Sequence, residues 1–494
     1  MTRTTNPLLP SALLLSHLVL ASVSTATTVG TLELEPCHLS NYPQEVLCGR
    51  HTVFENRVLA EGRRIDIHFA VIPAIDATSE ADPLVIFPGG PGQAAMEMGP
   101  LVSLVFGKLN ERRDVVLIDQ RGIGSSHPLE CETPDHAWRT LPADEQARLT
   151  RELLERCLED LDADVTFYTQ DLANQDIHEI LIALGYERIN TYGGSWGTRS
   201  ALLYAHRFPE HVRAMVLDGN LPLGNPAPMY ATADAERALD ALFSDCSEDS
   251  ACRKAFPDLE QEFDRALAVL EPNGVRVTMN DPTTGKPQTF VLTRDVFVSG
   301  LRSILYMPGL SRIVPLIIEQ AGNRDYRALA AASSYFETAG AMTTGAHLTI
   351  MCSEERPRME ASRLDREMNS GFLGRAFLEN YDNACSVWPT APLPSIYSED
   401  VHSEAPALIL SGEVDPITPP RWGEAMAAAL PNSLHLIAPE TGHGVATQGC
   451  APELISKFID QGHLEGIEGD CLSGLSRPSF FIDASGPAVR LDDD

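Results

Sequence analysis

The chain has 494 residues, with 37 Lys and Arg against 69 Asp and Glu, so its formal net charge at pH 7 is −32. This excess of carboxylates repels phosphate, which argues against nucleic acid and anionic membrane surfaces as partners. Hydrophobic residues make up 44% and aromatic residues 6% of the chain, the composition of a globular protein with a sizeable core.

The first 26 residues have the pattern of a secretory signal peptide. Arg3 lies in a short basic region, residues 8–23 are mostly apolar, and small residues stand at Ser24 and Ala26. The pattern predicts cleavage after Ala26 and export, to the periplasm or out of the cell. A membrane anchor is the alternative, but the stretch is shorter than the ~20 apolar residues of a spanning helix and contains His17. We therefore expect no stable membrane insertion.

The cysteines agree with export, because an even number in an exported chain indicates disulfides. Ten cysteines allow about 945 pairings, so sequence alone does not determine the connectivity. Metal ligation is the alternative, but the chain has no CxxC motif, so we expect no bound metal. Sequential spacing suggests five local bridges: Cys37 with Cys48, Cys131 with Cys157, Cys246 with Cys252, Cys352 with Cys385, and Cys450 with Cys471.

Between residues 65 and 218, short apolar runs alternate with helical patterns. Helical periodicity marks residues 172–185 and 198–208. Short apolar strands separated by amphipathic helices predict an α/β fold, with a mostly parallel sheet covered by helices on both faces. The predicted strands are residues 65–72, 84–87, 115–119, 188–192 and 214–218.

The alternation then stops for nearly two hundred residues. Residues 224–404 contain helical stretches at 231–245 and 257–270 and a possible hairpin at 276–292. A normal crossover needs only ~30 residues, so this segment is expected to be a mainly helical cap inserted in the chain. The alternation resumes with strands at 406–412 and 433–438 and helices at 421–430 and 452–460. The expected division is a signal peptide (1–26), a first core part (27–223), the cap (224–404), a second core part (405–471) and an acidic, peripheral tail (472–494).

The segment Gly193 to Gly197 reads GGSWG, a G-x-S-x-G pattern around Ser195. A nucleophile on a sharp turn from strand to helix needs small neighbours, because side chains there would collide with the flanking elements. A strand-like run precedes Ser195 and a helical pattern follows it. A glycine-rich turn without chemistry is the alternative reading. The context favours Ser195 as a catalytic nucleophile.

A serine nucleophile needs a histidine base and an acid that orients the base. In folds with a nucleophile elbow, the acid and then the histidine follow the serine along the sequence, each just after a strand. Asp415 lies five residues past the predicted strand end at Leu410, and His443 lies in a glycine-flanked loop after the next strand. We therefore predict a triad of Ser195, Asp415 and His443.

Other acids and histidines near these positions are alternatives. Glu413 lies two residues before Asp415, but Asp415 stands in the better-projected turn before a proline. His435 lies inside an apolar strand, and His206 and His178 lie on predicted helices, so we expect structural roles for these three.

An oxyanion hole needs backbone N–H donors aimed at the attacked carbonyl. The amide of Trp196, directly after the nucleophile, is one expected donor. The other is expected in the loop after the strand 84–87, where the sequence PGGPG at residues 88–92 lets backbone approach a substrate, and Gly90 is our candidate.

Together, PGGPG at 88–92, DQRGIGSS at 119–126, GGSWGT at 193–198, GEVDPITP and TGHG resemble the α/β-hydrolase family of prolyl and tripeptidyl aminopeptidases. The resemblance spans about residues 48–471, in the branch with a C-terminal tripeptidyl-aminopeptidase-like segment. It implies the α/β-hydrolase fold and hydrolysis of a residue or short peptide from a free N-terminus. The family has His before these glycines, where this chain has Pro88, so the local loop geometry can differ.

The resemblance also implies an acidic residue in the cap that pairs with the substrate ammonium. Glu354 and Glu355 directly follow Cys352, and Glu354 is the better candidate, with Glu355 in reserve. A solvated pair of carboxylates is the alternative.

The sequence therefore predicts an exported serine exopeptidase that acts on peptides with a free N-terminus and needs no cofactor. A carboxylesterase or lipase with the same triad is the alternative, because fold and triad do not choose between ester and amide. A non-catalytic binding protein with a hydrolase fold is a third reading.

Overall fold

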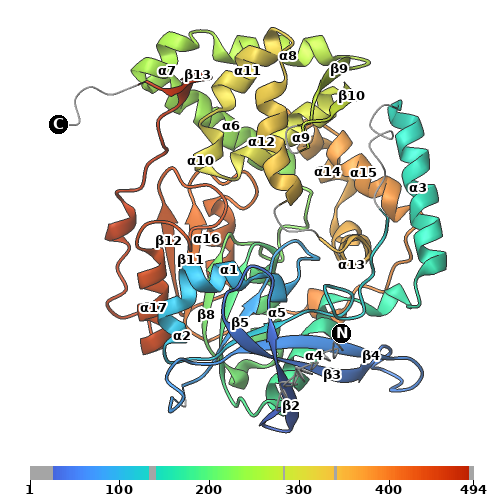
Figure 1. Cartoon of the computed structure of the whole chain (residues 1–494), viewed down its shortest axis with the longest axis vertical. Helices are drawn as coiled ribbons and strands as arrows, with labels where there is room; N and C mark the ends of the chain where they lie inside the picture. Colours follow the sequence, from blue (N-terminus) through green and yellow to red (C-terminus); the bar gives the residue numbers. More distant parts are fainter. Residues whose placement is uncertain (1–25, 80, 133–140, 282–283, 339–341, 489–494) are drawn as a thin grey trace, which may run out of the picture.

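The structure is a computed structural model that describes residues 26–79, 81–132, 141–281, 284–338 and 342–488 (Figure 1). The predicted signal peptide thus lies outside the described residues, apart from Ala26. A helical cap lies above a large sheet that helices cover on both faces (Figure 1). The α/β-hydrolase arrangement expected from the sequence is confirmed.

Among the described residues, ten strands form one sheet. Strands β6, β5, β7, β8, β11 and β12 run parallel, and the strands from β1 to β4 pair antiparallel at one edge. The order across the sheet is β1 (Thr27–Val29), β2 (Leu32–His38), β3 (Glu45–Phe54), β4 (Arg64–Ile72), β6 (Val115–Ile118), β5 (Leu84–Phe87), β7 (Ile189–Gly194), β8 (Val212–Asp218), β11 (Ala407–Gly412) and β12 (Ser433–Ala438).

The antiparallel edge differs from the expectation of a parallel strand at residues 65–72. Strand β4 pairs antiparallel with both β3 and β6. An apolar run does not encode strand direction, and here the antiparallel pairing follows from the short β3–β4 connection. Strands β1 to β3 were not predicted, because several of their side chains are exposed and no continuous apolar run marks them.

Successive residues of the buried strands face opposite layers of the core. On β5, Val85 and Phe87 pack into one apolar cluster, and Leu84 and Ile86 pack into the other. All four residues of this strand are buried, as expected for a parallel sheet with two covered faces.

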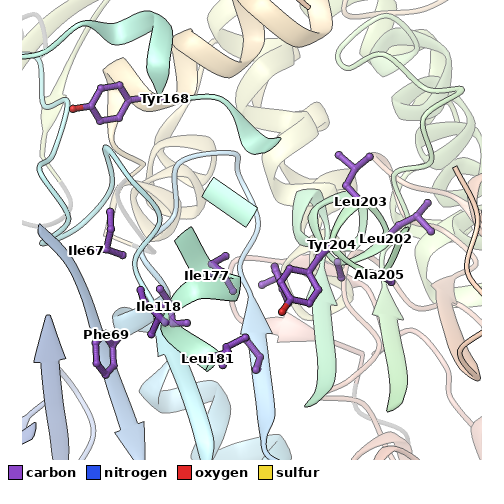
Figure 2. Packing of buried hydrophobic residues seen from close by; sticks show 14 of the residues in the cluster. Ile67, Phe69, Ile118, Tyr168, Ile177, Leu181, Leu202, Leu203, Tyr204 and Ala205 are labelled. Carbon is purple, nitrogen blue, oxygen red and sulfur yellow. The ribbon is translucent and has the colours of Figure 1, made fainter. Parts of the chain in front are cut away.

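Different helices supply the two apolar clusters. Side chains of α4, α5 and α16 join the first cluster. Figure 2 shows Ile177 and Leu181 of α4 on the side of Ile118 of β6. Helices α2 and α17 join the second cluster. The helices that accompany the sheet are α1 (Gly99–Leu101), α2 (Gly107–Asn110), α3 (Ala143–Asp160), α4 (Gln170–Ala183), α5 (Trp196–Arg207), α16 (Pro420–Ala428) and α17 (Ala451–Gln461).

The segment between β8 and β11 is mainly helical, and its first part has an apolar cluster of its own. The predicted hairpin is confirmed, since β9 pairs antiparallel with β10. The elements are α6 (Ala231–Glu248), α7 (Ser250–Ala255), α8 (Leu259–Leu270), β9 (Val275–Asn280), β10 (Pro287–Leu292), α9 (Arg294–Leu305), α10 (Pro308–Ser311), α11 (Val314–Gly322), α12 (Arg327–Thr338), α13 (Thr344–Ile350), α14 (Ala361–Met368) and α15 (Ala376–Cys385).

The later part of this segment packs against the sheet layer. Leu348, Trp388 and Ile396 belong to the same apolar cluster as strand β5. The expected limits of the cap, 224–404, therefore stay a prediction.

The C-terminal tail is not peripheral as expected. Phe480 is buried in the apolar cluster of the cap, and β13 (Phe481–Asp483), which pairs with β14 (Gly486–Pro487), contacts α7 and α11. Figure 1 shows the tail rising from the sheet to the top of the cap. Arg477 donates to Asp245 of α6, 3.0 Å away. The buried ring of Phe480 and the partly buried ring of Phe481 attach the tail to the cap despite its acidic character, because apolar burial is favourable whatever the net charge.

All five cysteine pairs suggested by sequential spacing are bonded in the structure, with sequence separations of 6 to 33 residues. In the part of the chain that the structure describes, no helix is long and apolar enough to cross a membrane.

Candidate active site

Ser195 lies on a sharp turn between β7 and α5, with φ 55° and ψ −120°. A non-glycine residue rarely adopts a positive φ, so this conformation is strained and must be held by its surroundings. Its N–H donates to Asp218 O over 2.8 Å, and the Thr198 hydroxyl donates to Ser195 O over 2.7 Å. Strand β8, through Asp218, and helix α5, through Thr198, therefore hold this turn.

The glycines around Ser195 are required by packing. A Cβ on Gly197 would lie 1.9 Å from Phe87 O, and a Cβ on Gly193 would lie 2.5 Å from Gly197 O. By contrast, a Cβ on Gly194 would meet nothing closer than 3.5 Å. Strand β5 and helix α5 pack so closely at this turn that only two of the three glycines are indispensable.

Asp415 and His443 are in contact, as the sequence predicts. Nδ1 of His443 lies 2.8 Å from Oδ2 of Asp415, and the Thr418 hydroxyl donates to the same oxygen over 2.7 Å. Oδ1 of Asp415 accepts from the N–H groups of Ile417 and Thr418. The carboxylate is fully buried, and its two oxygens are oriented by the turn in which the residue stands.

The pair is electrostatically coupled. Burial acts to raise the pKa of the Asp415 carboxyl, but the His443 imidazole and the hydrogen bonds lower it below its ordinary value. Burial acts to lower the pKa of His443, but the negative charges of Asp415 and Asp218 outweigh it and raise the pKa. This arrangement stabilises an imidazolium, which is what a general base becomes when it accepts a proton.

Asp218, at the end of β8, is a supporting residue that the sequence analysis missed. Its carboxylate accepts from the N–H groups of Val445 and Ala446, over 2.8 and 2.9 Å, and from the Tyr192 hydroxyl. It therefore holds the loop that carries His443. Its position at the last residue of a predicted strand, at the edge where the elbow lies, was the available signal.

The alternatives to the triad residues lie elsewhere. Glu413 is exposed and accepts from the N–H of Glu440. His435 pairs with Ser411, His206 with Glu399, and His178 with the Tyr204 hydroxyl. None of the three other histidines lines the cavity described below.

A cavity of about 630 Å³ lies at the carboxyl ends of the parallel strands. Ser195 and His443 both line it, together with residues of the loop after β5 and of the cap helices α6, α9 and α15. In open α/β sheets ligands bind where the strand order reverses, and here the order reverses at β5, between β6 and β7. The cavity therefore occupies the expected ligand site of the sheet.

The glycine loop after β5 approaches the nucleophile. A Cβ on Gly89 would lie 3.2 Å from Cβ of Ser195, and Gly90 has φ 110°, a conformation open to glycine. Gly89, Gly90 and Trp196 all line the cavity. The role of oxyanion donors for the N–H groups of Gly90 and Trp196 stays a prediction.

The DQRG motif, residues 119–122, holds the segment that follows this loop. Asp119 accepts from the N–H groups of Met96 and Ser125, both over 3.0 Å. Arg121 is fully buried and binds both carboxylate oxygens of Asp176 over 2.6 and 2.9 Å. The motif is structural, because neither charged side chain lines the cavity.

Glu354 is not placed for the role that the resemblance implies. It is fully buried in a π-helix, η6 (Met351–Glu355), and does not line the cavity. Its oxygens accept from the N–H of Gln170, over 2.7 Å, and from the Tyr397 hydroxyl, and burial raises its pKa to about 7. The Gln170 side chain in turn accepts from Nε1 of Trp196 over 2.9 Å. Glu354 therefore supports the residue after the nucleophile from outside the cavity.

Glu355 is likewise fully buried and off the cavity. It forms an ion pair with Arg199 of α5 and accepts from Nη2 of Arg358 and, over 2.6 Å, from the N–H of Ala227. Neither the substrate-binding role nor a solvated surface fits these two carboxylates. The sequence could not show this, because the partners are up to 184 residues away.

Two charged side chains from the cap do line the cavity, Asp234 on α6 and Arg302 on α9. Oδ1 of Asp234 lies 2.6 Å from Nη2 of Arg421, and Oδ2 accepts from Nε1 of Trp422 over 2.9 Å. Burial raises the pKa of Asp234 to about 6. No motif marked either residue. Among the described residues, no group of three or more His, Cys, Asp and Glu side chains is arranged to hold a metal ion.

Two protein families and several characterised relatives are similar to this chain. Residues 82–272 match the family described as alpha/beta hydrolase fold, and residues 370–471 match the family described as TAP-like protein. Serine protease Hip1 of Mycobacterium tuberculosis is 28% identical over 471 residues, which cover 87% of this chain and 88% of the relative. Tripeptidyl aminopeptidase of Streptomyces lividans is 24% identical over 460 residues, which cover 87% and 84%. Proline iminopeptidase of Neisseria gonorrhoeae is 31% identical over 137 residues, which cover 28% and 32%.

The matched segments contain the elbow and the acidic turn on which the cavity is built. The resemblance drawn from the motifs is therefore confirmed. The chain is a serine hydrolase with the α/β-hydrolase fold and a TAP-like segment.

Proposed function

We propose that the protein is an exported serine exopeptidase that removes residues or short peptides from free N-termini. The observation that carries the proposal is a cavity that holds Ser195 and His443 at its base and a carboxylate, Asp234, on its cap wall. The relatives named as a serine protease, a tripeptidyl aminopeptidase and a proline iminopeptidase support the same substrate class.

The proposed reaction is that of a Ser–His–Asp triad, and it is supported by the contact of His443 with Asp415 and by the cavity that Ser195 and His443 share. The Ser195 hydroxyl attacks the scissile carbonyl while His443 accepts its proton, and Asp415 keeps the imidazole in the tautomer with the proton on Nδ1. The N–H groups of Trp196 and Gly90 stabilise the negative charge that develops on the carbonyl oxygen. His443 then donates the proton to the leaving amine, and water releases the acyl group from Ser195.

Asp234 is the proposed partner of the substrate ammonium. An ammonium that enters a partly desolvated cavity needs an anion, because an unpaired buried charge is costly. Asp218 also lines the cavity, but its carboxylate is occupied by the His443 loop and the Tyr192 hydroxyl. The partner of Asp234, Arg421, has 46% of its side chain exposed and can turn toward water when an ammonium binds. Asp234 thus takes the place that the resemblance assigned to Glu354.

The test compares peptides with free and with blocked N-termini and a small neutral ester. A charged hydrogen-bonded pair is worth about 1.5 to 3 kcal/mol, so Asp234→Asn should lower kcat/KM for free-amine peptides by about 10- to 150-fold. The loss on the ester should be much smaller. Asp240→Asn is the matched control, because Asp240 is exposed on the same helix and does not line the cavity.

Ser195→Ala should abolish turnover of every substrate, with losses of about 10⁴-fold or more in kcat. Wild-type turnover of esters but not of free-amine peptides would favour the esterase reading. Absence of any turnover, together with no labelling of Ser195 by a fluorophosphonate, would favour the non-catalytic reading.

Export is proposed from the N-terminal segment and the five disulfides, because disulfides persist in oxidising compartments. N-terminal sequencing of the protein from its producing cells should begin at Thr27. A mature chain that begins at Met1 and is found in the cytoplasm would contradict this part of the proposal.

A further inference from the structure

Arg302 is a cation on the cavity wall that has no acidic partner among the side chains that the structure describes. It lies on α9 and lines the cavity that contains Ser195 and His443. Its Nε is buried and has no hydrogen-bond partner. Among the residues whose side chains the structure describes, no carboxylate forms an ion pair with it. The guanidinium is therefore placed where an anion in the cavity can reach it.

The other arginines around the site are occupied. Arg199 pairs with Glu355, Arg421 pairs with Asp234, and Arg237 donates to the carbonyl oxygens of Glu413 and Asp415, both over 2.8 Å. In a chain with 69 acidic and 37 basic residues, carboxylates are not scarce. Leaving a guanidinium unpaired in a cavity costs free energy, so an anion that arrives there gains affinity.

Two aromatic rings hold the guanidinium in place. Its central carbon lies 5.7 Å from the centre of the Tyr306 ring and 4.8 Å from that of Phe377, and both residues line the cavity. Contacts of this kind stabilise a cation and restrict the orientation of the planar guanidinium group, whose N–H donors form a fork. A fixed, planar fork matches the geometry of a carboxylate, which it can bind with two parallel hydrogen bonds.

The carboxylates that line the cavity, Asp234 and Asp218, are bound by other groups, and two further neighbours of Arg302 on the wall, Tyr381 and His347, are not anions. Tyr381 lines the same wall, and burial raises its pKa to about 12, so the phenol stays neutral. His347 bonds to Pro91 O and to the Tyr381 hydroxyl, and burial lowers its pKa. Arg302 and His443 line the same cavity, and the positive charge of Arg302 partly offsets the rise in the pKa of His443 that Asp415 causes.

We propose that Arg302 binds a carboxylate of the substrate and makes the enzyme prefer peptides that carry one near the scissile bond. This inference rests on the proposed peptidase function. The carboxylate has two possible sources, an acidic side chain or the free C-terminus of a short peptide. Both present the same planar anion to the same fork.

The test uses one short free-amine peptide in four forms: with Gln or Glu beside the scissile bond, each with a free or an amidated C-terminus. The wild type should hydrolyse at least one carboxylate-bearing form with kcat/KM about 10- to 150-fold above the amidated Gln form, the value of one charged hydrogen-bonded pair. Whether the side chain or the C-terminus carries this preference identifies the source.

In Arg302→Gln the ratio between the preferred form and the neutral form should fall to about one, and Arg302→Lys should keep part of it. Arg312→Gln is the matched control and should keep the wild-type ratio. Arg312 is also on the cap and also stacks on an aromatic ring, 4.8 Å from the centre of Phe481, but it does not line the cavity.

Equal losses on all four forms, or a change in the pH profile with the preference intact, would overturn the inference and leave Arg302 as a support for the fold or for His443. A wild type that shows no preference among the forms would also overturn it while leaving the peptidase function in place. If the wild type hydrolyses none of the four forms, the proposed function fails first and this inference fails with it.

Discussion

At the residue scale, the proposed catalysis depends on the contact between Asp415 and His443. Asp415→Asn should lower kcat by about 10⁴-fold, because an amide beside Nδ1 favours the wrong tautomer of the imidazole. Glu413→Gln, two residues away and exposed, should cost less than about tenfold by the same reasoning. The measurement is kcat with a neutral ester, which needs the triad but no ammonium. A large loss in the Glu413 variant with little loss in the Asp415 variant would mean that the acid is Glu413.

Glu354 makes the stability of the protein depend on pH. Its pKa is raised by burial to about 7, above the model-compound value of 4.5 for a glutamate in the unfolded chain. The folded state therefore binds a proton that the unfolded state releases, and its stabilising effect is full below pH 4.5 and is lost as the pH rises to about 7. The shift corresponds to roughly 3 kcal/mol.

Glu354→Gln should remove this dependence. Urea unfolding of the wild type and the variant at pH 5 and at pH 7.5 measures it, because other titrating groups are common to both proteins. The free energy of unfolding of the wild type should fall relative to that of the variant between the two values of pH. Parallel pH dependence in the two proteins would contradict the assignment of the raised pKa to Glu354.

At the scale of elements, the contact between β5 and α5 sets the geometry of the elbow. Gly197→Ala places a Cβ 1.9 Å from Phe87 O, so the helix must move away from the strand. Overpacking typically costs about 1 to 3 kcal/mol, and more when backbone is the obstacle, so the melting temperature should fall clearly. Gly194→Ala is the matched control, because its nearest contact is at 3.5 Å and its backbone is not in the left-handed region. Similar melting temperatures for the two variants would contradict the close contact between Gly197 of α5 and Phe87 of β5.

At the scale of the whole molecule, the disulfides stabilise segments within the sheet layer and within the cap, and none of them links the cap to the sheet layer. All five bridges close local loops, of 6 to 33 residues. The cap is joined to the sheet by non-covalent contacts such as the ion pair of Arg199 with Glu355 and the hydrogen bond from the N–H of His443 to Tyr306 O. Because Tyr306 belongs to the segment between β8 and β11, the position of His443 depends on that segment.

Reduction should therefore lower the melting temperature of the whole protein. Loops of these lengths are worth about 2 to 4 kcal/mol each in a chain-entropy treatment. Thiol titration of the unfolded, unreduced mature protein should find no free thiol, and thermal melts with and without reductant measure the loss. Several free thiols before reduction, or identical melts, would contradict the five bridges.

The strand-to-helix turn at Ser195, the contact between Asp415 and His443 and the positions of the central strands could be predicted from the sequence because they depend on local rules. A glycine-flanked serine between a strand and a helix, an acid and a histidine that each follow a strand, and buried strands without polar residues all leave a mark within a few residues. The local disulfide pairs belong to the same class, since short separations favour them.

Tertiary structure alone decided which charged residues face the cavity. Glu354 and Glu355 carried the more suggestive pattern, yet distant partners hold them in the interior, and Asp234 and Arg302, which no pattern marked, line the cavity. The same is true of the tail, whose Phe480 packs into the cap. The local sequence around a charged or aromatic residue on a helix does not determine whether its side chain faces water, the core or a cavity. Its environment is set by the packing of helices that lie far apart in the chain, and that packing leaves no local signal.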